Sequence, residues 1–314
     1  MDSVVGLLDG PRARGAFVLR SVLRPPWSLR IQDRAPLTVV AMAAGSAHIN
    51  PDSASADVLR PGDVAVLRGP DAYTIASGEG IAPQAVIHPG QRCTTVDGQE
   101  LVDIASLGVR TWGNDPAGQV VMITGTYTQH HEIGKHLLAA LPPLVTLRAD
   151  HWDQPLVALV EREATVDRPG QEAVLDRLLD LLLVAGLREW FAGQGADEPG
   201  WYRATTDPVV GKAVRLMQNA PSRQWTVGSL AAATGVSRAV FARRFGELAG
   251  QPPMTFLTTW RLDLAADLLL EPDATLASVA RQVGYANPFA LSSAFKRVRG
   301  ISPQQHRAAV RNVN

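Results

Sequence analysis

Short apolar runs, separated by Pro, Gly, Asp and Asn, fill the chain between residues 16 and 130. They include FVLRSVL, LTVVAMAA, DVAVLRG and QVVMITGTY. Runs of this length between turn residues are typical of β-strands, and many of them in series indicate a sandwich or a barrel. We therefore predict that this part of the chain is rich in β-structure.

After about residue 135 the apolar residues recur every three or four positions, which indicates helices. EIGKHLLAALPPLVTL and QPLVALVEREATV are predicted as short helices broken by prolines, and residues 171–193 as one long helix. A helix as apolar as the long one needs partners on more than one side. Packing within the chain and a dimer interface both meet this need. The long helix has two apolar stripes. One holds Val174, Leu178, Leu181 and Ala185, and the stripe beside it holds Leu175, Leu179, Leu182 and Trp190.

The C-terminal third contains the same unit twice. GSLAAATGVS at 228–237 and ASVARQVGYA at 277–286 match at a spacing of 49 residues, and Phe245, Gly250 and Pro253 have counterparts 50 residues later. Each copy predicts a helix-turn-helix, whose second helix can enter the DNA major groove. TFLTTWRLDLAADLLL predicts a joining helix, which would place the two recognition helices about 34 Å apart on one side of a duplex.

The charge of the chain is divided between its two parts. Residues 221–314 hold eleven Lys and Arg and five acidic residues, a net charge of +6, and because the whole chain holds 30 of each, the first 220 residues carry −6. A basic segment on an acidic body is typical of a nucleic-acid-binding module joined to another domain, although a solubilising surface has the same composition.

These motifs resemble a known family. WTVGSLAAATGVSRAVFARRFGELAGQPP, RLDLAADLLL and LASVARQVGYANPFALSSAFKRVRGISPQQHR, within Asp207 to Arg311, resemble the AraC/XylS-type DNA-binding domain. LRPGDVAVL, LLAALPPLVTL and the REW that ends the long helix resemble, less specifically, the cupin-like sensor domains of that family. The resemblance implies a transcription regulator, often dimeric, whose sensor domain binds a small molecule.

Together these features predict an α+β protein. It would have an N-terminal cupin-like β-barrel with a helical segment, and a C-terminal all-α double helix-turn-helix domain. The stretch GQGADEPGWYRATTD is rich in Gly, Pro and acids, as linkers are. The predicted parts are residues 1–135 for the sensor domain, 136–193 for a helical dimerisation segment, 194–206 for the linker and 207–314 for the DNA-binding domain.

In the first unit the recognition helix is predicted to follow the N-cap Ser237, with Val240, Phe241 and Phe245 facing inward. Arg238 faces the groove, and Arg244 a phosphate or water. The resemblance assigns base reading to Ala239, Ala242 and Arg243. Only Arg243 has the reach and the forked geometry to bind guanine O6 and N7.

In the second unit the helix is predicted to begin near Asn287. Lys296 and Arg297 are expected to contact phosphates, which position a protein without reading sequence. Phe289 either packs on a thymine methyl group or belongs to the core. The DNA-binding residues expected here, most of them from the resemblance, are Asn287, Pro288, Phe289, Ala290, Ser292, Ser293, Lys296 and Arg297.

The N-terminal part lacks the pattern of a metal-binding cupin, which needs two close histidines, a carboxylate and a later histidine. His48 has no second histidine two residues on, and Tyr73 stands where the late histidine would fall. We therefore expect no metal and no cofactor, and take His48 and Tyr73 as candidate residues of an effector pocket. Arg92 beside Cys93 would lower the pKa of a reactive thiol. An ordinary loop cysteine is the alternative.

The single cysteine and the lack of a signal-peptide pattern predict a cytoplasmic protein, and the apolar run 178–187 is too short to cross a bilayer. The expected partners are double-stranded DNA, a small-molecule effector, a second copy of the chain and RNA polymerase. We expect a regulator and not an enzyme, and assign it as an activator, although the residues do not separate activation from repression. The alternatives are a metal-dependent cupin oxygenase with a DNA-tethering domain, and an architectural DNA binder with weak sequence preference and steep salt dependence.

Overall fold

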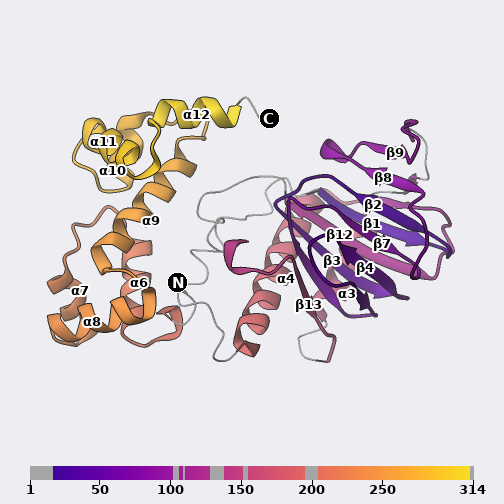
Figure 1. Cartoon of the computed structure of the whole chain (residues 1–314), viewed down its shortest axis with the longest axis horizontal. Helices are drawn as coiled ribbons and strands as arrows, with labels where there is room; N and C mark the ends of the chain where they lie inside the picture. The colour runs from indigo at the N-terminus through magenta and orange to yellow at the C-terminus, as the bar shows by residue number, and fades with distance from the viewer. Residues whose placement is uncertain are drawn as a thin grey trace. The chain divides into compact units, whose positions relative to one another are not determined.

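The computed structural model describes residues 17–101, 106–108, 110–127, 138–150, 155–194 and 204–311, which form two compact units (Figure 1). The first unit holds the described residues up to 194, and the second holds residues 204–311. The described part of the first unit is built on β-sheets covered by helices, and that of the second is helical. This confirms the predicted α+β class, with the β-structure in the N-terminal part and the helical domain at the C-terminal end.

Two sheets make up the described β-structure. The larger sheet has the order β10-β11-β1-β12-β3-β6-β13, and the smaller sheet has the order β5-β4-β7-β2-β8-β9. The strands of the larger sheet are β1 (Phe17–Leu23), β3 (Leu37–Ala44), β6 (Val64–Arg68), β10 (Ser106–Gly108), β11 (Thr111–Gly113), β12 (Val120–Tyr127) and β13 (Leu144–Leu147). Those of the smaller sheet are β2 (Ser28–Ile31), β4 (Ala47–Pro51), β5 (Asp57–Leu59), β7 (Tyr73–Ala76), β8 (Ala85–Ile87) and β9 (Cys93–Thr95).

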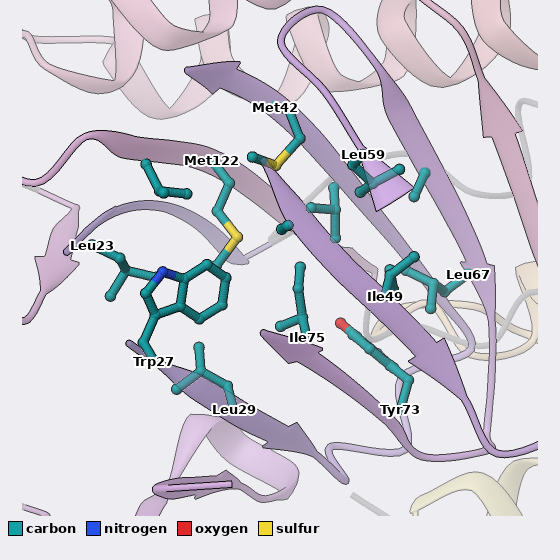
Figure 2. Packing of buried hydrophobic residues seen from close by; sticks show 14 of the residues in the cluster. Leu23, Trp27, Leu29, Met42, Ile49, Leu59, Leu67, Tyr73, Ile75 and Met122 are labelled. Carbon is teal, nitrogen blue, oxygen red and sulfur yellow. The ribbon is translucent and has the colours of Figure 1, made fainter. Parts of the chain in front are cut away.

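The two sheets share one hydrophobic core, which lies between them. Figure 2 shows Met42 and Met122 from the larger sheet packed with Trp27, Ile49 and Ile75 from the side of the smaller sheet. These side chains are almost completely buried, and burying one of this size stabilises a fold by roughly 1.5–3 kcal/mol. The alternation of each strand places its core-forming residues on one face, so the apolar pattern of the sequence becomes the contact between the sheets.

Helices α3 (Pro155–Ala164) and α4 (Gln171–Gly193) cover the other face of the larger sheet (Figure 1). A Cβ atom on Gly125 of β12 would lie 2.7 Å from Cδ2 of Leu179, so α4 packs closely on β12 at this glycine and a side chain there would require Leu179 to move. Leu175, Leu179 and Leu182 are buried, whereas Val174 and Leu181 on the other predicted stripe are 44% and 49% exposed. In the described part of the chain, every helix is too short or too polar to cross a membrane.

The prediction of a helix through LLAALPPLVTL is wrong in its second half. Residues 138–140 are helical, but residues 144–147 form β13, which pairs with β6 through Val145 and Val66. Pro142 and Pro143 prevent the helix from continuing. The edge of β6 then offers backbone hydrogen bonds to the extended LVTL segment.

The turn PGD before β6 is held by a buried carboxylate. Asp63 accepts hydrogen bonds from the backbone N–H groups of Arg60, at 3.0 Å, and Ala149, at 2.9 Å. Arg148 donates to Asp63 at 3.1 Å and also binds both oxygens of Asp57, at 2.6 and 2.7 Å. A buried charge is tolerated when it is paired and hydrogen-bonded in this way. Asp63 therefore ties the turn to the chain after β13.

The helical unit contains two small cores joined by one helix. The described helices are α6 (Val210–Asn219), α7 (Val227–Thr234), α8 (Arg238–Ala249), α9 (Pro253–Leu268), α10 (Leu276–Gln282), α11 (Pro288–Arg299) and α12 (Pro303–Arg311). Leu257 of α9 packs in the first core with Phe241 and Phe245, and Leu262 of α9 packs in the second core with Phe295. This confirms the two predicted helix-turn-helix units and the joining helix.

The two copies also share their helix caps. Thr226 and Ser229 form a capping box at α7, and Thr275 and Ser278, 49 residues later, form the same box at α10. The turn before α11 needs Gly284, whose φ is 82° and whose Cβ would lie 2.7 Å from Cα of Ser222. The repeat in the sequence is therefore a repeat of local hydrogen bonds as well as of apolar positions.

Replacing Asp63 by alanine should lower the free energy of unfolding of the first unit by about 2–4 kcal/mol, because Arg148 and two backbone N–H groups lose their acceptor. Urea denaturation followed by circular dichroism measures this loss. Glu79→Ala, at an exposed position, is the control and should change little. Equal midpoints for the two variants would show that the Asp63 network contributes nothing.

Candidate DNA interface and ligand cavity

Helix α8 presents the predicted reading residues to solvent. Its N-cap Ser237 accepts a hydrogen bond from the N–H of Val240 at 3.3 Å, and Phe241 and Phe245 anchor the inward face. Arg238, Ala239 and Arg243 are exposed, and Ala242 is half-buried. Val240 does not face inward as predicted, since it is 41% exposed. It lies about 100° around the helix from Phe241, away from the line that Phe241 and Phe245 define.

Arg244 has a structural partner within the fold, although its side chain stays 42% exposed. Its Nε donates to Asp207 at 3.0 Å. Asp207 in turn accepts from the N–H groups of Val209 and Val210, at 2.9 and 2.8 Å, at the start of α6. Burial alone would raise the pKa of Asp207, but the hydrogen bonds from Arg244, Val210 and Val209 together hold it below its usual value. Recognition helix α8 is thereby fastened to the start of the unit.

Arg243, the predicted base reader, is held only weakly. Its guanidinium donates to Glu247 at 3.0 Å, one turn along α8, and the two side chains are 69% and 58% exposed. Exposed ion pairs of this kind contribute less than about 1 kcal/mol. The guanidinium can therefore leave Glu247 at small cost when a stronger acceptor is present.

Helix α11 repeats the arrangement. Its N-cap Asn287 accepts a hydrogen bond from the N–H of Ala290 at 2.9 Å. Leu291 and Phe295 anchor it in the core, and Phe289 is 83% exposed. Of the two interpretations of Phe289, the exposure excludes the core. On the same helix Ser293, Lys296 and Arg297 are exposed, and Pro288, Ala290 and Ser292 are half-buried.

Several cations of the basic segment hold the fold together. Arg261 donates to the carbonyls of Pro221 and Arg223 at 2.7 and 2.9 Å, and Arg307 to those of Leu269 and Ala274 at 2.8 and 2.7 Å. Arg299 pairs with the buried Asp263 at 2.6 Å. Among the described residues from 221 to 309, the cations whose side chains form no hydrogen bond or ion pair are Arg238, Arg281, Lys296, Arg297 and Arg223, the last of which lies over the ring of Trp225. Three of these five cations therefore lie on α8 and α11, while Arg281 lies on α10 and Arg223 lies in the turn before α7.

A cavity of about 660 Å³ lies between the two sheets of the first unit. One wall is a row of direct cross-strand partners, Tyr73, Ile31, Ile87 and Cys93. The opposite wall includes Leu19, Thr124 and Val40, which also pair in sequence across β1, β12 and β3. A largely apolar cavity of this size with a few polar groups is typical of a small-molecule site.

The two candidate pocket residues have different positions. Tyr73 lines the cavity, and burial raises the pKa of its hydroxyl far above the usual value. His48 does not line it, because Ala47, Ile49 and Pro51 are the buried residues of β4 and His48 alternates to the other face. Sequence reasoning also missed Asp33, Arg110 and Trp112, which line the cavity from turns and from the short strand β11, segments that carry no recognisable pattern.

The surroundings of Cys93 do not make it a thiolate. Burial, and then the charge of Glu100, raise the pKa of the thiol. Arg92 does not lower it, because its guanidinium pairs with Glu100 at 2.6 Å. Cys93 begins strand β9 and faces the cavity wall, and is not a loop residue. Within the described residues no three His, Cys, Asp or Glu side chains gather as metal ligands do, and His130, His131, His136 and His151 lie outside those residues.

Comparisons with known proteins match both parts of the chain. A family model described as Cupin matches residues 2–192, and one described as Helix-turn-helix domain matches residues 230–309. A putative AraC-like transcription regulator of Streptomyces lividans is 31% identical over 312 residues, which is 98% of each chain. The chain belongs to the AraC-like transcription regulators.

Two further proteins are similar, one over the whole chain and one over its C-terminal third. The RCS-specific HTH-type transcriptional activator RclR of Escherichia coli (strain K12) is 26% identical over 100% of this chain and 99% of its own. The DNA-binding domain of AdpA, solved in complex with a target DNA, is 36% identical, covers 35% of this chain and 97% of its own, and has a TM-score of 0.33. The two family models and the full-length relative make this AraC-family chain a DNA-binding transcription regulator with a cupin-like N-terminal domain.

Arg244→Ala should destabilise the AraC-type helical unit by about 1–2 kcal/mol, because Asp207 loses its charged partner at the start of α6. In the wild-type chain the stabilisation from the Arg244–Asp207 pair should be present at neutral pH. It should disappear on acidification, as the pH falls through the lowered pKa of Asp207 and its carboxylate is protonated. Hydrogen–deuterium exchange of the full chain should show faster exchange in α6 and α8. Arg238→Ala, at an exposed position, is the control. Unchanged exchange with lost DNA binding would instead make Arg244 a phosphate contact.

Proposed function

We propose that this regulator reads DNA through α8 and α11 and responds to a small molecule held between its two sheets. The proposal that α8 and α11 read DNA is supported by the difference between cations that pair within the fold and cations that do not. Arg244, Arg261, Arg299 and Arg307 have partners within the fold. The cations left for phosphate and base contacts lie mainly on the two helices that follow the glycine turns.

The proposed roles follow from side-chain chemistry. Arg243 leaves Glu247 and binds a guanine edge. Lys296 and Arg297 contact phosphates together with Arg238. Ser292 and Ser293 donate to bases or phosphates from the middle of α11. The apolar contacts proposed for thymine methyl groups are Ala239, Ala242 and Phe289, with Asn287 and Pro288 placing the start of α11.

The cavity is the proposed effector site, with Tyr73 in its wall. We assign no catalytic step to it, since relatives that span the whole chain are transcription regulators. In this proposal residues 1–135 form the sensor domain, 136–193 the dimerisation segment, 194–206 the linker and 207–314 the DNA-binding domain. The effector changes how the linker holds the DNA-binding domains, and thereby which half-sites are bound together.

Arg243→Ala should weaken binding to the preferred site by about 1–3 kcal/mol and relax the preference at one base pair. Lys296→Ala should weaken binding to all sequences alike and lower the salt slope by about one, since it removes one phosphate contact. Equilibrium selection from a randomised duplex library, with salt titrations, separates the two outcomes. Lys212→Ala, exposed on α6, is the control. An unchanged sequence preference in Arg243→Ala would contradict the assignment of the reading face.

Two copies of the chain are proposed to associate through the exposed stripe of α4. Val174 and Leu181 are 44% and 49% exposed there, and Leu178 and Ala185 are half-buried. The other stripe already packs on the larger sheet, so this one is left for a second chain. An apolar stripe at helical spacing suits a self-complementary helix pair across a two-fold axis.

Leu181→Glu should raise the dissociation constant of the dimer by at least about tenfold, because a carboxylate would be buried in an apolar contact. Sedimentation equilibrium of the full chain measures this change. Val96→Glu, at a turn position that is 64% exposed, is the matched control. Equal association of the two variants would place any dimer contact elsewhere.

A further inference from the structure

One carboxylate in the cavity wall has no charged partner among the residues that the structure describes. Asp33 follows β2 and lines the cavity beside Tyr73. It accepts a hydrogen bond from the N–H of Ala35 at 3.1 Å and forms no ion pair with a described residue. Arg68, which lies near it behind the cavity, donates instead to the carbonyl of Leu138 at 3.5 Å.

The surroundings of Asp33 disfavour its charge. Burial raises the pKa of Asp33, and the hydrogen bonds from the N–H groups of Ala35 and of Asp33 itself offset only part of this effect. The charge of Asp33 also contributes to the raised pKa of Tyr73, which places the two groups close together. An unpaired carboxylate in such a wall is stabilised by any cation that binds beside it.

The other charged residue of the wall has an acidic neighbour within the fold. Arg110 lies 3.9 Å from Glu172 at the start of α4. Asp33 is therefore the charged residue of the described cavity wall without an ion-pair partner among the described residues, and its charge is negative. The remaining wall is mainly aliphatic and aromatic, with Phe17, Trp112 and Tyr73 among the rings that could face a ligand cation.

We propose that the effector is a small organic cation, an amine on an apolar body, whose charge lies against Asp33. This inference rests on the proposed effector cavity and adds the chemical class of the ligand. The ammonium group supplies the partner that Asp33 lacks, and the apolar walls enclose the rest of the molecule. In this arrangement Asp33 determines specificity, because an anion of the same shape meets a like charge and a neutral molecule leaves the carboxylate unpaired.

The test uses three probes with one body: 2-phenylethylamine, 2-phenylethanol and 3-phenylpropionate. Cys93 is the single cysteine of the chain and lines the cavity, so its rate of reaction with a thiol reagent reports occupancy in the full-length protein. At neutral pH the amine should protect Cys93 at a concentration at least about tenfold lower than the other two probes, as expected for one charge-assisted contact.

Asp33→Asn should reduce this preference to about twofold or less, and Asp33→Glu, which keeps the charge, should retain it. Glu79→Gln removes an exposed charge of the same unit and is the control. Equal protection by all three probes, or an amine preference that survives in Asp33→Asn, would overturn the cationic class and leave the cavity as the effector site. Failure of all three probes to protect Cys93 in the wild-type chain would count against the cavity itself as well as the class.

Discussion

The DNA-binding part depends on a single helix that belongs to two hydrophobic cores. Helix α9 packs against α8 through Leu257 and against α11 through Leu262 and Ala266. A rigid helix shared in this way prevents either recognition helix from turning independently of the other. Arg307 and Arg261 strengthen the constraint, because they bind carbonyl groups at the end of α9 and in the turn before α7.

The same constraint explains the distribution of charge. A domain that binds a polyanion needs cations on its surface, and this one also uses cations to satisfy buried carbonyls and carboxylates. Arg299 and Arg244 show the second use, since each pairs with a largely buried aspartate. The cations of α8 and α11 that lack partners stay in water, where their release to phosphate carries little desolvation cost.

The first unit combines tight packing with open space. Near Trp27 and Met42 the two sheets meet in a closed core, and Met122, Thr124 and Tyr73 line the cavity beside it. Side chains alternate between the two faces of each strand in the closed core and in the cavity wall alike. The two regions therefore differ in the size and polarity of the side chains that point inward. Helix α4 seals the far side of the larger sheet and leaves one of its own stripes exposed.

Local chemistry in the sequence was sufficient for the repeat, the N-caps Ser237 and Asn287, the glycine turns and the α+β division, because each depends on residues that lie close together along the chain. Only the tertiary structure decided which partner a residue meets. Arg244 pairs with Asp207, and residues 144–147 form a strand that pairs with β6. His48 lies on the face of β4 that points away from the cavity lined by Tyr73. Asp33 and Arg110 could not be predicted as neighbours of one cavity, since strand pairing between distant segments brings them there. Hydrophobic period and capping are short-range properties of a chain, whereas pairing and burial depend on contacts between segments whose separation no local pattern encodes.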